Sequence, residues 1–177
     1  MLPTTILLGV VLIYRSVILV TSQDCIDRSL SARMEDCCLM PKPFPRNVLF
    51  ACSRKIRQLS SASPAVLHWC KMECYYKELG ILADDNILNM DRIRQFLEKM
   101  DERVQTTYET AYRTCEESLL KKKDNVLKAM CGSYPALMED CVKKIVDERC
   151  KDDSVKDYFF ESVLCNQVRA GQTLCPT

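Results

Sequence analysis

The stretch HWCKMECYYKELG, residues 68–80, places two cysteines, Cys70 and Cys74, four positions apart in a segment of helical character. This spacing keeps both side chains on one face of an α-helix. Such a pair can be half of a metal site, a redox pair, or two points at which neighbouring segments are tied to the helix. The compartment of the protein decides among these interpretations.

The N-terminal segment predicts secretion. Residues 6–20 are almost wholly apolar apart from Arg15, and TSQDC follows them, with Val20 and Ser22 at the small-residue spacing of a cleavage site. The apolar stretch before Arg15 is far shorter than the roughly 20 residues of a membrane-spanning helix. We therefore expect a signal peptide at residues 1–22, a secreted extracellular chain, and no stable insertion in a membrane.

The cysteines predict a disulfide framework, because all twelve of them follow the expected cleavage site. They are Cys25, Cys37, Cys38, Cys52, Cys70, Cys74, Cys115, Cys131, Cys141, Cys150, Cys165 and Cys175. In an oxidising compartment this even number predicts six disulfides and no free thiol. A zinc site would need a second close Cys or His pair, and C-x3-C lacks the spacing of thioredoxin-type redox sites. The pair in residues 68–80 is therefore interpreted as disulfide anchors, and no metal or other cofactor is expected.

Charge balance argues against nucleic acid as a partner. Loss of residues 1–22 removes one basic residue, Arg15, which leaves 24 basic and 24 acidic residues. The one basic cluster, KKKD at residues 121–124, is interpreted as a solvated loop. The remaining chain of about 155 residues is long enough for one domain with a core of its own, and we expect a single domain over residues 23–177.

The boundaries of the C-x3-C helix can be read from the sequence. Ser63 and Pro64 provide an N-cap and a proline at the first helical position, and Gly80 follows the last helical residue. Asn89 can cap a second helix, and the periodic segment 104–120 either continues that helix or forms another. Further helices are expected within residues 47–59, 126–131, 134–150 and 154–168. The chain thus reads as a helical bundle over residues 47–177.

The N-terminal part of the mature chain differs from this pattern. The segment CCLMPKPFPRN contains three prolines within residues 41–45, and proline is not compatible with the interior of a helix. We therefore expect residues 23–46 to form an extended, disulfide-stapled arm. Because Cys37 and Cys38 are adjacent, they are expected to bond with two different partners.

The cysteine spacing resembles that of a known family. The series Cys70-x3-Cys74-x40-Cys115, followed by Cys131-x9-Cys141-x8-Cys150, is similar to the insect odorant-binding proteins, and the additional cysteines resemble their twelve-cysteine Plus-C branch. The segment ELGILADDNILNMDRI, residues 78–93, also resembles the one by which those proteins leave the C-x3-C helix. The resemblance extends over residues 37–175.

The resemblance implies an all-α fold, a compact disulfide-stapled bundle of about six to eight helices around an apolar cavity. It implies a non-enzymatic carrier of small hydrophobic semiochemicals, odorants or pheromones, in sensillum lymph or another secretory fluid. The implied partners are small apolar ligands, with a chemosensory receptor or a second subunit as further candidates. The implied disulfides are Cys70–Cys141, Cys115–Cys150 and Cys52–Cys74, and the other six cysteines stay unassigned.

Aromatic and methionine side chains on the inward helical stripes are candidates for the cavity wall. We place the cavity between residues 89–120, residues 126–131 and the segment DYFFESVL, residues 157–164. Its expected lining is Phe96, Met100, Tyr108, Tyr112, Met130, Phe159 and Val163. Methionine adapts to several ligands, although residues of these types also form ordinary helical cores.

Two other classes of protein were compared with the carrier. A phospholipase A2-like hydrolase would need a His–Asp pair and a glycine-rich calcium loop, and His68 and DDNILNMD, residues 84–91, do not supply that spacing. A secreted interaction or effector protein would use the same fold without a ligand cavity, and the sequence does not separate it from a carrier. With His68 as the single histidine, we expect weak pH dependence of ligand affinity between about pH 7 and 5.5.

Overall fold

A computed structural model describes residues 25–58, 62–83, 87–121 and 131–176. Throughout these ranges the regular secondary structure is helical, and three isolated β-bridges are the extended pairings present. This confirms the all-α fold. The expected signal peptide, Met130 and nearly all of the helix expected at residues 126–131 lie outside the described residues.

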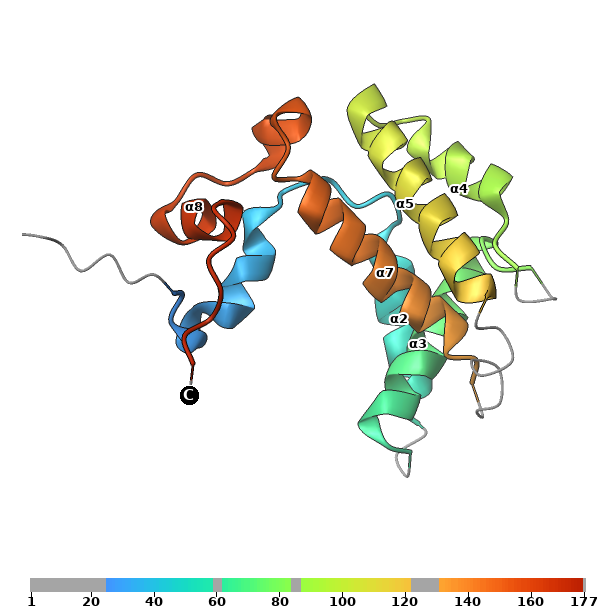
Figure 1. Cartoon of the computed structure of the whole chain (residues 1–177). Coiled ribbons are helices and arrows are strands. Elements are labelled where there is room, and N and C mark those ends of the chain that lie inside the picture. Colours follow the sequence, from blue (N-terminus) through green and yellow to red (C-terminus); the bar gives the residue numbers. More distant parts are fainter. Residues whose placement is uncertain (1–24, 59–61, 84–86, 122–130, 177) are drawn as a thin grey trace, which may run out of the picture. The chain divides into compact units, whose positions relative to one another are not determined.

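The described chain divides into two compact units (Figure 1). The helical unit, residues 35–161, contains α2 (Arg46–Ile56), α3 (Pro64–Leu79), α4 (Met90–Leu97), α5 (Glu102–Leu120), α7 (Tyr134–Arg149) and the 3-10 helix η2 (Asp153–Tyr158). The terminal unit, residues 25–34 together with 162–176, contains α8 (Val163–Arg169) and most of the 3-10 helix η1 (Arg28–Cys37). A single domain over residues 23–177 stays a prediction.

Helix α3 has the boundaries that its sequence predicts. The Ser63 hydroxyl accepts a hydrogen bond from the Val66 N–H, and Pro64 is the first helical residue. Gly80 ends the helix with φ of 70°, a left-handed conformation that glycine adopts without a steric penalty. Both caps are therefore encoded locally. They fix the bounds of the helix that carries Cys70 and Cys74.

Residues 89–120 form two helices, which answers a question that the periodicity left open. Asn89 caps α4 by accepting a hydrogen bond from the Arg92 N–H at 3.0 Å. Asp101 caps α5 in the same way, accepting from the Arg103 N–H at 3.0 Å. A second N-cap four residues after the end of α4 starts a new helix, because the Asp101 side chain satisfies a backbone donor that a continuous helix would pair internally.

The helical unit is built on the long helices α5 and α7, which pack side by side (Figure 1). Helix α3 packs against both α2 and α7, and α4 covers part of α5. The buried residues of α5 recur at the spacing of one helical face. They are Val104, Tyr108, Ala111, Tyr112, Cys115 and Leu119.

All twelve cysteines are disulfide-bonded, as expected. Cys52 on α2 is bonded to Cys74 on α3, which is the expected pair. The other two expected pairs are wrong. Cys70 is bonded to Cys131 instead of Cys141, and Cys115 is bonded to Cys141 instead of Cys150. Two further bridges are Cys38–Cys150 and Cys25–Cys175.

The geometry of α7 explains this displacement by one cysteine. Cys131 precedes α7, where the Gly132 N–H donates to the Glu73 carboxylate of α3 at 2.7 Å and so brings this segment beside Cys70. Cys141 and Cys150 are nine residues apart, which is two and a half helical turns, so they point to different neighbours. Cys141 points to α5, and Cys150, at the end of α7, is bonded to Cys38.

Two expectations about secondary structure need correction. The arm over residues 23–46 is not extended throughout, because residues 28–37 form η1; the proline-containing residues 38–45 are non-helical, as expected. The single helix expected at residues 154–168 is instead η2, an extended link and α8. At that link Phe159 has extended backbone angles and forms an antiparallel bridge with Cys38, so pairing with the arm replaces helical hydrogen bonds.

The terminal unit is held by contacts between the beginning and the end of the described chain. Ile26 and Leu174 form a parallel bridge, in which the Ile26 N–H donates to the Thr173 carbonyl at 2.8 Å and the Cys175 N–H to the Ile26 carbonyl at 2.9 Å. The Cys25–Cys175 disulfide closes this pairing covalently. Ile26 is buried, with an exposed fraction of 1%.

Candidate functional site

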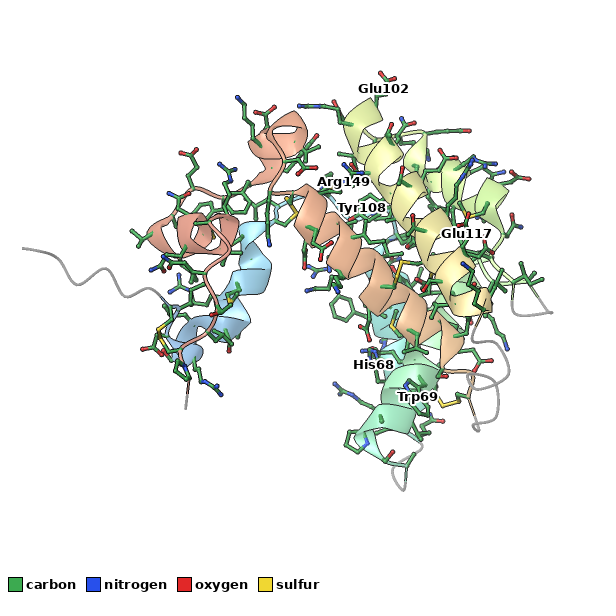
Figure 2. The ribbon with its side chains drawn as sticks, viewed as in Figure 1. His68, Trp69, Glu102, Tyr108, Glu117 and Arg149 are labelled. Carbon is green, nitrogen blue, oxygen red and sulfur yellow. A yellow bond between two sulfur atoms is a disulfide. The ribbon has the colours of Figure 1, made fainter. Side chains whose placement is uncertain are left out.

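The helical unit contains a pocket of about 350 Å³, which is within the range of small-molecule sites. One wall consists of Tyr108 and Tyr112 on α5, and another of Glu139, Val142 and Val146 on α7. Residues 38–45, which we call the strap, form a third wall, and α3 contributes Tyr75. In Figure 2, Tyr108 lies on the side of α5 that faces α7. The pocket thus combines four segments that are distant in sequence.

The strap is fixed at its first residue by covalent and backbone bonds. Cys38 is bonded to Cys150 at the end of α7. On either side of Cys38, the Leu39 N–H donates to the Tyr158 carbonyl at 2.7 Å, and the Phe160 N–H donates to the Cys37 carbonyl at 2.9 Å. Three prolines keep the following residues out of a helix. The strap therefore has a non-helical backbone conformation, and two of its apolar side chains, Met40 and Phe44, are buried.

Phe44 of the strap is the centre of an aromatic cluster. Its ring centroid lies 6.4 Å from that of Tyr75, 6.0 Å from that of Tyr112 and 5.2 Å from that of Phe96. The rings meet edge-on or tilted, which are the favourable geometries for aromatic pairs. One strap residue thereby connects α3, α4 and α5 at the pocket wall.

Glu139 is a charged residue on the pocket wall and is partly buried. Its Oε2 atom accepts a hydrogen bond from the Tyr76 hydroxyl at 3.1 Å, and the Tyr76 hydroxyl also forms a hydrogen bond with that of Tyr112. Burial raises the pKa of the Glu139 carboxyl, and the Tyr76 hydrogen bond and the charge of Lys42 offset part of that rise. The pocket therefore contains a carboxylate whose charge is only partly compensated.

The tyrosines around the pocket are neutral hydrogen-bonding groups at physiological pH. Burial raises the pKa of Tyr75 to about 12, with a further contribution from the charge of Glu139. Burial also raises the pKa of Tyr108 and of Tyr112 above that of an ordinary phenol. The Tyr108 hydroxyl has no hydrogen-bond partner among the described residues, so it can donate to a ligand.

The structure brings only part of the expected cavity lining together. Tyr108 and Tyr112 line the pocket. Phe96 packs behind Phe44, with the Arg92 guanidinium 4.8 Å from its ring centroid, and Met100 is partly buried beyond the end of α4. Neither of these two side chains is part of the pocket wall.

The C-terminal contribution to the expected lining is corrected most strongly. Phe159 is buried in the extended link that pairs with Cys38 and is absent from the pocket wall. Val163 begins α8 in the terminal unit, and 81% of its surface is exposed. The expectation assumed one helix across residues 157–164, and the extended link changes which face each residue presents. Met130 lies outside the described residues.

Several pocket residues were missed by the sequence interpretation. Glu139 carried a usable signal, because it lies three residues before Val142 and seven before Val146 and so occupies the apolar face of α7. A carboxylate at such a position requires a partner. Met40 and Phe44 carried no such signal, since nothing in an extended, proline-rich segment shows which helices it contacts.

The surroundings of His68 give no support to the hydrolase interpretation. His68 borders a separate, mainly apolar depression between α2 and α3, together with Ile56, Pro64, Leu67 and other residues. In Figure 2 it lies on α3, away from Tyr108. Residues 84–86 of the compared calcium segment lie outside the described residues. Where the structure is described, no group of three His, Cys, Asp or Glu side chains is arranged to hold a metal ion.

These features define a class of protein: a disulfide-bonded chain whose described residues form a helical fold with a pocket of the size of small-molecule sites. Residues 53–132 match the model of the PBP/GOBP family. This segment is therefore similar to a PBP/GOBP family domain, and the twelve disulfide-bonded cysteines of the chain fit a twelve-cysteine odorant-binding protein. The matched segment contains α3, α4 and α5.

A curated relative agrees with this family. The chain is 25% identical over 154 residues to general odorant-binding protein 68 from Anopheles gambiae, a match that covers 80% of this chain and 69% of the relative. No solved structure matches the chain significantly. None of the helices in the described ranges is both long and apolar enough to cross a membrane.

Proposed function

We propose that the helical unit carries small hydrophobic semiochemicals, odorants or pheromones, in the pocket between α5, α7 and the strap. Similarity to the PBP/GOBP family supports a small-ligand carrier, and the proposal adds the ligand class and the place where it binds. The observation that carries the proposal is the pocket itself, in which a disulfide-fixed strap and two long helices surround apolar and aromatic side chains. Binding to such a preformed site requires little reordering of the protein.

The proposal also covers location and the absence of catalysis. Members of the family are binding proteins, and the chain acts as a carrier without a catalytic step. Twelve disulfide-bonded cysteines fit an oxidising, extracellular compartment. Within that compartment, we place the protein in a secretory fluid such as sensillum lymph, where a carrier can solubilise apolar molecules.

The test is displacement of a neutral, apolar fluorescent dye by a panel of volatile compounds. The parent protein should bind the dye, and volatiles should compete at micromolar concentration. Val142→Phe should weaken dye binding at least about tenfold, because Val142 lines the pocket and the larger ring occupies ligand space. The matched control is Leu137→Phe on the same helix, since Leu137 is 37% exposed and lies outside the pocket.

A second variant keeps this test decisive if Val142→Phe does not fold. Tyr108→Leu removes a hydroxyl and part of a ring from the opposite wall, and it should change the order of affinities within the panel. If the folded parent binds neither dye nor volatiles, the carrier proposal fails. The secreted interaction or effector protein with the same fold would then replace it.

A further inference from the structure

We propose that the pocket prefers apolar ligands that end in a protonated amine, with Glu139 as the group that binds the ammonium. This inference rests on the proposed carrier function and adds the chemistry of the ligand's polar end. Glu139 lines the pocket wall, and its Oε2 atom accepts a hydrogen bond from the Tyr76 hydroxyl. Its Oε1 atom accepts no hydrogen bond from the described residues, so one acceptor atom remains for a ligand.

The cations near the pocket do not neutralise Glu139 by contact. Lys143 is paired with Asp147 at 3.2 Å. Lys42 acts on Glu139 through its charge, but no ion pair within 4.0 Å joins the two in the described structure. Lys42 and Arg46 are both exposed at the rim. A ligand cation that reaches Oε1 would therefore provide the close counter-charge that the protein itself lacks.

The aromatic walls also favour a cation at this position. Phe44, Tyr75, Tyr108 and Tyr112 line the same pocket as Glu139. The faces of such rings attract an ammonium group, most strongly where water is excluded. A carboxylate surrounded by aromatic rings thus has two independent attractions for an amine. A ligand carboxylate would instead be repelled by Glu139.

The rest of the wall suits the apolar part of such a ligand. Met40 from the strap and Val142 and Val146 from α7 are buried and apolar. Pockets of this type use many apolar contacts for affinity and a few polar groups for orientation. The amine end would accordingly lie at Glu139, with the hydrocarbon chain along α7 and the strap.

Isothermal titration calorimetry with n-octylamine, 1-octanol and octanoic acid tests this inference, because these compounds share a chain length and differ at the polar end. At pH 7 the amine should bind about tenfold more tightly than the alcohol, as charge-assisted hydrogen bonds are stronger than neutral ones. The acid should bind most weakly. Glu139→Gln should abolish the preference for the amine and leave alcohol affinity within about twofold, since Gln removes the charge and keeps an acceptor for Tyr76.

The matched control is Asp140→Asn, which removes an exposed negative charge from the adjacent position on α7 and should preserve the amine preference. Equal affinity of the parent for amine and alcohol would overturn the inference, while binding of both would leave the carrier function intact. Binding of none of the three would contradict the carrier function itself. If Glu139→Gln does not fold, Tyr76→Phe serves instead. It removes a hydrogen bond that lowers the pKa of the Glu139 carboxyl, so the preference for the amine should decrease, and an unchanged preference would contradict the inference.

Discussion

The two units of this chain are stabilised by different means. The helical unit buries long helical faces, among them six residues of α5 alone. Two of its disulfides, Cys52–Cys74 and Cys115–Cys141, join helices that already pack together. The described part of the terminal unit is far smaller than the roughly 40 residues below which domains usually need covalent help. It has two short helical elements and one β-bridge. Its order therefore depends on its disulfides, whereas that of the helical unit depends on its core.

This difference explains where sequence interpretation succeeded. Helical periodicity reports the burial of one face, so it locates elements that are stabilised by a core. In the terminal unit and the link before it, backbone pairing between distant segments determines the structure, and no local pattern encodes such pairing. Four predictions test this contrast between the units.

The largest effect is expected in the terminal unit. Replacing Cys25 and Cys175 together by serine should release the two chain ends, because the Ile26–Leu174 bridge is too short to persist alone. Hydrogen exchange measured by mass spectrometry should show the amides of Ile26 and Cys175 losing their protection. The helical unit should keep its protection and its ligand affinity. Loss of protection in α5 as well would show that the two units do not differ in this way.

The second prediction concerns a disulfide within the helical unit. Replacing both Cys70 and Cys131 by serine opens a loop of sequence separation 61 and should lower the free energy of unfolding by roughly 4 kcal/mol, measured by urea denaturation. The variant should still fold, since α3 and α7 also pack through their side chains.

A matched pair of cysteines checks the connectivity itself. Replacing Cys70 and Cys141 removes one partner from each of two bridges and should leave Cys131 and Cys115 as free thiols. Thiol titration of the unfolded protein should therefore find thiols in this variant and none in the Cys70–Cys131 variant. The opposite result would restore the pairing that the resemblance implied.

The third prediction compares Phe44 with Val163. The sequence analysis placed Val163 in the cavity lining and missed Phe44, whereas in the structure Phe44 lines the pocket and Val163 is exposed. Phe44→Ala should cost about 3 kcal/mol, the lower end of the range for a buried phenylalanine, because part of its surroundings is already open pocket. Val163→Ala should change stability by less than about 0.5 kcal/mol, because Val163 is mostly exposed. Thermal melting of both variants measures this. Similar losses would mean that Val163 contributes to a core.

The candidate site was predictable only in part, for identifiable reasons. Tyr108 and Tyr112 were found because they lie on the buried stripe of a long, regular helix. Val163 was misplaced because its helix was assumed to include the extended Phe159. Phe44 could not be found, since its contacts depend on the disulfide at Cys38 and on backbone pairing with residues 158–160. Local propensity thus predicted helices, and the long-range bonds of the strap determined the pocket.

The pH dependence of ligand binding is another property that the sequence predicted only in part. The sequence contains a single histidine, the residue type whose ordinary pKa lies nearest neutrality, and we therefore expected weak pH dependence of ligand affinity. The pKa of the Glu139 carboxyl rises toward neutrality because the group is buried, and burial cannot be read from a sequence. The groups that act on it are Lys42, Asp140, His68 and the tyrosines at 75, 76, 108 and 112. For an amine ligand, affinity should therefore fall as pH decreases and Glu139 is protonated.

The smallest expected effect is on stability, in the variant Glu139→Gln. In the unfolded chain Glu139 loses its proton near the ordinary pKa of 4.5, whereas the folded protein retains it to higher pH. Between the pKa of Glu139 in the unfolded chain and its higher pKa in the folded protein, the unfolded state binds fewer protons than the folded state. The parent therefore loses stability as pH rises through this range. Glutamine does not titrate, and its side-chain oxygen can still accept a hydrogen bond from the Tyr76 hydroxyl. The variant should therefore be slightly more stable than the parent at pH 7, and equally stable below about pH 4.5.

Urea denaturation at several pH values measures this difference, with Asp140→Asn as the control. Asp140 is exposed, and its replacement should change stability by less than about 0.5 kcal/mol throughout. A Glu139→Gln variant that is less stable than the parent at pH 7 would mean that attraction to Lys42 outweighs the cost of burying the carboxylate. In that case the protein itself would supply the counter-charge, and the preference for an amine ligand should decrease in the same measurements.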